Sequence, residues 1–452
     1  MVHLIIEYYI LGSIILGFFF LLIGKPVWNL LLLVLCIPFE NTLVIPSSIS
    51  LIKAMTILTF LSLAIHRKDF ISFIIDKLIT NKFFLVFVGI FIASSLFSVE
   101  KSTIIGEVLG WIQWFLILLY IWYVCEREDR AIGLIEKSLI GLGIAILFMI
   151  FVVQGYSSLS TRLYLARFLN SNKLAVIYTG LSVVAYGILA KSRSRIVGVI
   201  LLTFLVSIML TGNRSVPVGF FIYFVLVIFL SSKINKLRVF AVTAALILLF
   251  LIIPFKRDSF LFNSRERISY TFKQLYELVL HKETTISTFE ESYHTSLYRS
   301  SRIDSDARWL MYQEAFNIFL KNPIVGSGPG NTLFERTIFR VYQRPKGMHS
   351  NVSEMLLYFG LFGFVFMIFL VITLFRFSYR WLSLIESKQF LFLLIVFFID
   401  GLFHVNYIDS VIVMFLALTG FRLHRTVQEL LHEDTEIDEL SESEMTTIVV
   451  EL

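Results

Sequence analysis

Arg308 lies in the first turn of a predicted amphipathic helix that begins after Asp304-Ser-Asp306. The apolar side chains of this helix recur every three to four residues and form one stripe: Trp309, Tyr312, Phe316 and Leu320. A cation near a helix N-terminus opposes the macrodipole, at a cost of about 0.3–1 kcal/mol. A bound anion would remove that conflict, so Arg308 is a candidate ligand for an anionic group. The alternative is an ordinary solvated arginine.

A glycine-rich turn follows this helix, which is predicted to end at Asn322-Pro323. Gly326, Gly328 and Gly330 occupy alternate positions, which allows a close-approach backbone whose amides can face an anion. The turn is not a Walker loop, because no Lys-Ser/Thr follows the last glycine, and it is not a dinucleotide fingerprint, because no strand precedes it. The alternative is a plain turn after a helix.

Two of the histidines in or beside predicted membrane spans are candidates for chemistry. His349 stands at an outer membrane boundary, where an imidazole can take a proton from a substrate hydroxyl near neutral pH. The alternative is an interfacial histidine that only hydrogen-bonds. His404 lies four residues after Asp400 on one helical face, which indicates either a functional site or a structural pair.

Three more candidate arginines lie in predicted outer loops that precede the large loop. Arg214 occupies a very short turn between two spans, where it can neutralise a phosphate bidentately in a poorly hydrated site. The alternative for Arg214 is a side chain that snorkels to the interface. Arg162 and Arg167 add positive charge in the outer loop 155–172, beside Asn172.

The composition indicates that a membrane surrounds the elements that carry these residues. The chain has 452 residues, of which 57% are hydrophobic and only 16% are charged, whereas a soluble domain carries about 25% charged residues. The two cysteines, Cys36 and Cys125, cannot form a disulfide framework and show no metal-binding spacing. We therefore predict no metal site and no cofactor.

The hydropathy pattern predicts an all-α, polytopic bundle of about 12–13 transmembrane helices, each needing about 20 apolar residues. The candidate spans are 3–23, 27–46, 49–66, 82–98, 105–124, 132–154, 173–191, 196–212, 215–231, 237–254, 352–376, 388–405 and 408–424. Residues 68–81 are predicted to form an interfacial helix. A loop of about a hundred residues without structure would be unusual, so the large loop is predicted to be a mostly helical extracytoplasmic domain.

The chain is predicted to divide into four parts: a membrane bundle at 1–254, the catalytic loop at 255–350, C-terminal membrane helices at 351–424 and an acidic, disordered cytoplasmic tail at 425–452. Lys and Arg of the short loops collect on one side, which the charge bias assigns to the cytoplasm. These basic loops are 67–68, 127–130, 191–195, 233–238 and 376–388. The large loop then lies outside, and its excess of basic residues suits an anionic lipid headgroup or a lipid-linked pyrophosphate.

In combination, these motifs resemble the bacterial O-antigen ligase and O-antigen polymerase superfamily. The resemblance rests on Arg308, on Pro323-x-x-Gly-x-Gly, and on His349 with Gly360-x-x-Gly363 after it. Thr211-Gly-Asn-Arg214 and Asn172-x-Leu-Ala175 fit the same family, so the match runs from about residue 170 to 365. The sequence departs from the family pattern at Ser350, where asparagine is frequent, and at Asn213, where serine is usual.

The resemblance implies a membrane glycosyltransferase that moves a glycan from an undecaprenyl-pyrophosphate carrier to an acceptor sugar hydroxyl in cell-surface polysaccharide or lipopolysaccharide biosynthesis. Carried over to this sequence, Arg214 and Arg308 would hold the pyrophosphate and His349 would be the catalytic base. Further substrate contacts are predicted for Arg162, Arg167, Asn172, Gly326, Gly328 and Asn351. The implied partners are the lipid-linked donor, a lipid- or glycan-bearing acceptor and membrane lipid, but no nucleic acid. The implied location is the bacterial inner membrane, with the site on the periplasmic face.

Three alternatives stay open at this point. An O-antigen or exopolysaccharide polymerase would use the same chemistry with a different acceptor. A flippase or transporter of lipid-linked sugars would bind the same headgroup, but it has no use for a base and is expected to show pseudo-symmetric halves, which the sequence lacks. A structural or sensory membrane protein would leave the arginine–histidine arrangement unexplained.

Overall fold

The computed structural model describes residues 2–39, 43–45, 49–97, 101–154, 171–211, 213, 215–230, 315–329, 351–403 and 410–450. Nearly all of these residues are helical; the exception in regular structure is an antiparallel pair formed by β1 (Leu43–Ile45) and β2 (Ile49–Ser50). The predicted all-α fold class is confirmed.

The first helices are α1 (Val2–Leu22), α2 (Pro26–Cys36) and α3 (Leu51–His66), with a 3₁₀ turn at Ile37–Phe39 after α2. The prediction of one continuous span over 27–46 is wrong. Pro38 has no amide hydrogen with which to continue an α-helix, and its ring crowds the preceding turn. The apolar run therefore changes to the 3₁₀ turn and then to β1.

A sharp bend separates α4 (Phe70–Thr80) from α5 (Lys82–Leu96), whose axes differ by 77°. Asn81 lies at the bend and caps α5, since its side-chain oxygen accepts a hydrogen bond of 3.1 Å from the amide of Phe84. The sequence-based separation of 68–81 from the span 82–98 agrees with this bend.

The longer helices follow. They are α6 (Lys101–Arg127), α7 (Ala131–Gln154), α8 (Ser171–Ser192), α9 (Arg195–Thr211), α10 (Ser215–Leu230), α15 (Asn351–Arg380), α16 (Ile385–Phe403) and α17 (Ser410–Val450). Within the described residues, five helices are long and apolar enough to cross a membrane, and the bent α4–α5 pair would make a sixth. Apart from 27–46, which is helical only in its first part, every predicted span overlaps a described helix along most of its length, except 237–254, which lies outside the described residues.

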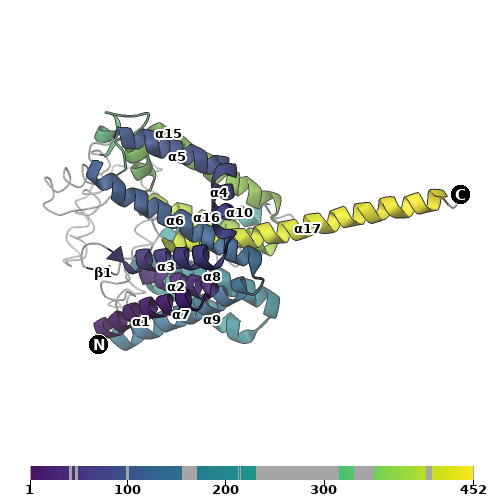
Figure 1. Ribbon diagram of the computed structural model, residues 1–452, viewed down its shortest axis with the longest axis horizontal. Coiled ribbons are helices and arrows are strands. Elements are labelled where there is room, and N and C mark those ends of the chain that lie inside the picture. The colour runs from purple at the N-terminus through teal and green to yellow at the C-terminus, as the bar shows by residue number, and fades with distance from the viewer. Residues whose placement is uncertain are drawn as a thin grey trace, which may run out of the picture.

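The C-terminal helices pack into the same core as the N-terminal ones. One cluster of buried side chains contains Ile146 from α7, Leu181 from α8 and Phe415 from α17. α16 and α17 run through the bundle beside α8 and α6, while α5 and α15 lie side by side at one edge (Figure 1). The two predicted membrane parts therefore form one bundle although a long stretch of chain separates them.

Ion pairs hold the charged loops together at one end of this bundle. They join the α3–α4 loop to the end of α6 and to the α6–α7 loop, α8 to α16, and α17 to α7 and to the α6–α7 loop. The pairs are Arg67–Glu128, Arg127–Asp69 (2.7 Å), Lys191–Glu386 (3.4 Å), Arg422–Glu136 (2.5 Å) and Arg425–Asp129 (3.0 Å). Four of the five loops that were predicted to share the cytoplasmic side thus carry or adjoin these ion pairs, and the fifth, 233–238, lies outside the described residues.

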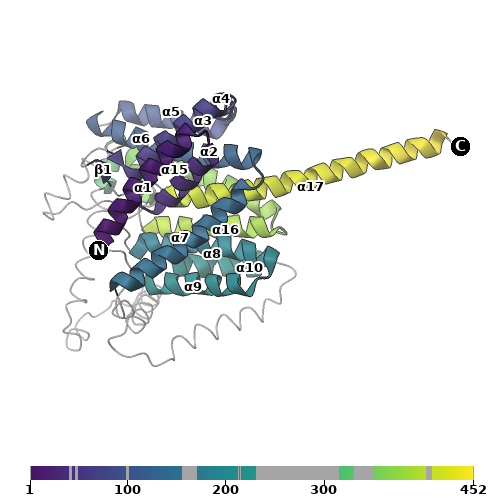
Figure 2. The same cartoon turned by 60° about the horizontal axis from the view of Figure 1, so that its bottom comes forward.

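Residues 425–450 are helical, so the prediction of a disordered tail is wrong for them. α17 continues to Val450 and extends well beyond the bundle (Figures 1 and 2). The segment contains no Gly or Pro and is rich in Glu and Leu, which have good helix propensity. A pair between Arg425 Nε and Glu429 Oε1 at 2.9 Å adds an i,i+4 contact. Net charge indicated disorder here, but local helix propensity favours the helix.

Candidate functional site

A buried polar cluster lies at the other end of the bundle, where α8 and α10 begin and α16 nears its end. Asn213 lies between α9 and α10, and its side-chain nitrogen is 3.3 Å from Asn172 Oδ1 and 3.4 Å from Asp400 Oδ1. The Ser215 hydroxyl lies within hydrogen-bond distance of Asp400 Oδ1 and 2.7 Å from Asn213 Oδ1. We call Asn172, Asn213, Ser215 and Asp400 the polar cluster.

Burial makes this cluster energetically demanding. The exposed fraction is 6% for Asn213, 3% for Ser215 and 1% for Asp400. A carboxylate removed from water is costly unless hydrogen-bond donors surround it. Asn213 and Ser215 supply such donors to Asp400 Oδ1, which offsets part of the cost of burying this side chain.

Close packing of α10 against α16 brings the cluster together. Gly219 lies one turn after Ser215, and a Cβ atom there would stand 2.9 Å from the Cα atom of Val396. Val396 lies one turn before Asp400 on α16. Because Gly219 has no side chain, the two helices approach closely enough for Ser215 to reach Asp400.

Arg214 itself lies outside the described residues, but both of its chain neighbours belong to the polar cluster. Asn213 Oδ1 accepts a hydrogen bond of 3.0 Å from the amide of Val216 and so caps α10. A capped helix N-terminus favours a bound anion, through its free amides and its dipole. Lys173, next to Asn172 in α8, is also buried, with 7% of its surface exposed.

Several other candidate residues from the sequence are outside the described residues too. This applies to Arg308 and His349, and to Arg162, Arg167 and His404. Asn351 is the first residue of α15, and its side chain is not among those described. Convergence of Arg214, Arg308 and His349 on one cavity therefore stays a prediction.

The glycine-rich turn is described as far as 329. Gly326 and Gly328 have left-handed φ angles of 75° and 85°, which glycine adopts without strain. Their amides donate to main-chain oxygens, Gly326 N to Asn322 O at 2.9 Å and Gly328 N to Tyr358 O at 3.1 Å. An anion could contact these two amides only if the main-chain bonds were given up. A substrate contact by the two glycines stays a prediction.

Two further residues near the predicted site did not enter its list of ligands. Ser215 is missed because a serine after an arginine carries no distinctive pattern. Glu354, in the first turn of α15 five residues after His349, is 1% exposed, and its Oε1 lies 3.4 Å from the Tyr358 hydroxyl. An acidic residue inside a predicted span is the signal that could have selected Glu354.

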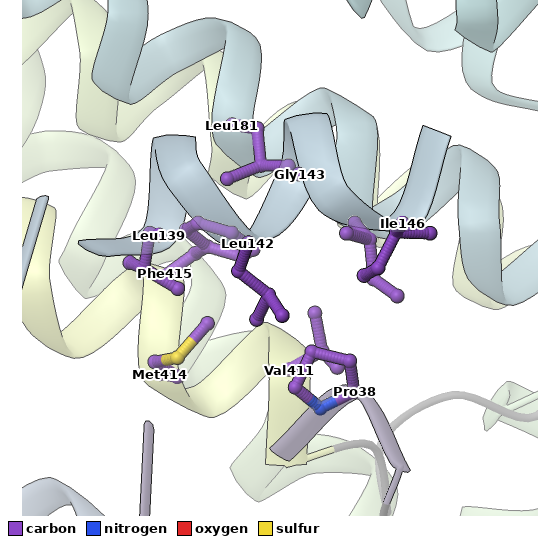
Figure 3. Close-up of a pocket in the computed structure, with 10 residues that line it drawn as sticks. Pro38, Leu139, Leu142, Gly143, Ile146, Leu181, Val411, Met414 and Phe415 are labelled. Carbon is purple, nitrogen blue, oxygen red and sulfur yellow. The ribbon is translucent and has the colours of Figure 1, made fainter. Parts of the chain in front are cut away.

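Other features of the described residues offer less for chemistry. No three His, Cys, Asp or Glu side chains gather there as a metal site would require. A cavity of about 10 Å³ lies between α7, α8 and α17 (Figure 3). Its lining is apolar: Pro38, Leu139, Leu142, Gly143, Ile146, Ile177, Leu181, Val411, Met414 and Phe415. Such a space is about the size of one water and lacks polar partners for it, so it is a packing gap in the core.

Comparison with known proteins gives one family. Residues 198–368 match the family model described as O-antigen ligase. The matched stretch includes Arg214, Arg308 and His349, together with the glycine-rich turn and Gly360. No curated protein matches the chain.

Proposed function

The chain belongs to the O-antigen ligase and polymerase superfamily, and on this premise we propose that it is a metal-independent membrane glycosyltransferase. The family gives it a ligase- or polymerase-like role in polysaccharide biosynthesis. The donor that we propose is a glycan on undecaprenyl pyrophosphate, and the acceptor is a sugar hydroxyl. The site faces the periplasmic side of a bacterial inner membrane.

One observation carries this proposal: the residues on both sides of Arg214 are held in the buried polar cluster. Asn213 and Ser215 contact Asp400, and Asn213 caps the helix that begins at Ser215. In the sequence, Arg214 stands between these two residues, and the N-terminus of a helix is its positive end. A buried network formed by both chain neighbours of one arginine is costly to build and supports a role in binding an anion, for which a lipid-linked pyrophosphate is suited.

The polar cluster also supports the side of the membrane that we propose. It lies at the end of the bundle opposite the ion-paired loops, whose basic residues indicate the cytoplasm. A glycan carrier presented on the outer leaflet would meet the cluster there.

The chemistry needs no metal in principle, because a sugar pyrophosphate is already an activated leaving group. His349 takes the proton of the acceptor hydroxyl, whose oxygen attacks the anomeric carbon of the donor. The bond from that carbon to the pyrophosphate breaks, and undecaprenyl pyrophosphate leaves with its charge stabilised by Arg214 and Arg308. Displacement is direct, so the new linkage has the inverted anomeric configuration.

The test uses the purified full chain in lipid or detergent with a lipid-pyrophosphate oligosaccharide, candidate acceptors and a chelator. We expect glycan transfer by the wild type and a loss of about 10²–10⁴-fold in His349→Ala, because a general base contributes that factor. His432→Ala is the matched control, since His432 is exposed on α17. Arg214→Ala is compared in the same way with Arg195→Ala, because Arg195 is exposed at the start of α9.

The outcomes separate the candidate functions. Undiminished transfer by His349→Ala would remove the base that we propose, and a product that retains the donor configuration would contradict direct displacement. Transfer to a second lipid-linked unit identifies a polymerase, and transfer to a lipid-anchored core sugar identifies a ligase. Movement of the lipid across vesicles without a new glycosidic bond would favour a flippase.

A further inference from the structure

The helical conformation of α15 is interrupted at one residue, which the apolar pattern of its sequence does not predict. Gly360 has φ 62° and ψ −156°, far from helical values, although residues on both sides are helical. In a continuous α-helix the amides of Leu361 and Phe362 would bond to the carbonyls of Leu357 and Tyr358, four residues earlier. The break removes both of these bonds inside a helix that is a candidate membrane span.

The glycine-rich turn inserts into this gap and replaces the lost partners. Ser327 N donates to Leu357 O at 2.8 Å, and Gly328 N donates to Tyr358 O at 3.1 Å. In return, Leu361 N donates to Pro323 O at 2.9 Å, and Phe362 N donates to Ile324 O at 3.2 Å. Four inter-segment hydrogen bonds thus take the place of two helical ones, and no amide or carbonyl of the interrupted pair is left unsatisfied. We call this arrangement the spliced junction.

Two glycines are required because the two backbones touch. A Cβ atom on Gly326 would lie 2.6 Å from the amide nitrogen of Gly360, and a Cβ atom on Gly360 would lie 2.6 Å from the amide nitrogen of Gly326. Real Cβ atoms do not approach main-chain atoms so closely. Both residues also have positive φ angles, which other residues adopt only at a cost. Any side chain at either position would force the two segments apart.

α5 supports the junction from the other side. The Ser94 hydroxyl donates to Tyr358 O, the same carbonyl that accepts from Gly328. Ser94 is fully buried. Around it, Phe87, Phe91 and Trp111 pack against Phe359, the residue before the break.

The junction joins two segments that follow the residues of the proposed reaction in the chain. Arg308 precedes the described start of the turn segment, Ala315, by seven residues, and His349 precedes the start of α15 by two. We propose that the spliced junction is a positioning device for glycan transfer: it fixes the segment that follows Arg308 in the chain against the helix that follows His349. Gly326, Gly360 and Ser94 are its positioning residues. The expected effect on glycan transfer rests on the proposed function, but the geometry of the junction can be tested without it.

The first test measures transfer by Gly326→Ala and Gly360→Ala against Gly89→Ala. Gly89 is a matched control, because it lies in α5 beside the junction and a Cβ atom there meets nothing within 4 Å. We expect kcat to fall about 10²-fold in the two junction variants and to stay unchanged in the control, since a misplacement of about 1 Å costs that much. The loss appears in kcat more than in KM, because the geometry of the reacting groups changes. Ser94→Ala should give a smaller loss, since it removes one hydrogen bond without a clash.

The second test measures the junction without reference to activity. Spin labels are placed at Lys321, exposed beside the turn, and at Tyr379, exposed on α15, with Cys36 and Cys125 replaced by alanine. The distance distribution between the labels should be narrow in this background and with Gly89→Ala, and broader or shifted with Gly326→Ala. Folded monodisperse protein is confirmed for each variant by gel filtration.

These measurements keep the two proposals apart. An unchanged distance in Gly326→Ala would overturn the junction as a positioning device, and so would a changed distance with undiminished transfer. Failure of the wild type to transfer any glycan would reject the proposed function while the label distances still test the junction.

Discussion

The exposed ion pair at one end of the bundle and the polar cluster at the other end differ in how far their side chains are exposed to solvent. At the charged end, Arg127 and Asp69 pair while much of each side chain stays exposed. At the other end, Asn213, Ser215 and Asp400 are almost completely buried and satisfy one another. Exposed pairs are weak and replaceable, whereas a buried network costs stability when any member is lost. The difference supports the proposal that the buried polar groups at the second end serve glycan transfer, whereas the ion pairs at the first end join loops and helices.

The largest predicted effect comes from opening the polar cluster. Asp400→Ala removes the acceptor for Asn213 and Ser215, which flank Arg214. We expect glycan transfer to fall about 10²-fold, since a displaced binding group costs that much, and Asp400→Asn to lose less. Asp76→Ala on α4 is the control, because Asp76 is exposed. Full activity of Asp400→Ala would show that the cluster is structural only.

The next largest effect is expected on stability, at a buried ion pair of the charged end. Arg422 and Glu136 pair at 2.5 Å with exposed fractions of 13% and 4%. Loss of one partner leaves a buried charge, so Arg422→Ala should lower the free energy of unfolding by about 3–5 kcal/mol. Replacing both residues by leucine should recover much of that loss. Unfolding in detergent measures the stability, and kcat of the folded fraction should stay unchanged. A loss of kcat without a loss of stability would contradict a purely structural role for this ion pair.

A smaller effect on stability is expected at the exposed ion pair between Arg127 and Asp69. The Tyr123 hydroxyl, at 2.6 Å, and the Arg127 guanidinium, at 2.8 Å, hold the pKa of Asp69 below its usual range. Because the folded pKa is depressed, the stabilisation is complete above the unfolded value of about 3.9 and is lost as pH falls through the folded pKa. Asp69→Asn should therefore have a slightly lower Tm than the wild type at neutral pH, with the gap closing in acid. A gap that widens in acid would contradict this sign.

The smallest effect is predicted for the tail. α17 extends away from the bundle toward its C-terminus (Figures 1 and 2). Deletion of residues 433–452 should leave both transfer and Tm unchanged, because the described ion pairs of α17, at Arg422 and Arg425, lie before the deletion. A fall in glycan transfer of more than twofold would show that the deleted part of α17 contributes to the reaction.

Hydropathy predicted most helices because each is long and apolar enough to be recognised without its neighbours. It failed over 27–46, where Pro38 ends the α-helix inside an apolar run. It failed again after Arg425, where acidic composition suggested disorder and helix propensity prevailed. The sequence marked the glycine-rich turn as a possible anion site, but it gave Gly360 only as part of the motif Gly360-x-x-Gly363, with no sign of a break. Backbone pairing between segments thirty residues apart leaves no periodicity in the sequence.

The sequence alone determined the membrane class, the helices and the candidate arginines and histidine, because apolar length and residue chemistry are local properties. Tertiary structure decided that Asp400 meets Asn213 and Ser215 and that the turn at Gly326 completes the interrupted helix at Gly360. Both arrangements depend on which helices lie close enough for side chains or backbones to touch. That proximity results from packing across the whole bundle, to which every helix contributes and which no single motif encodes.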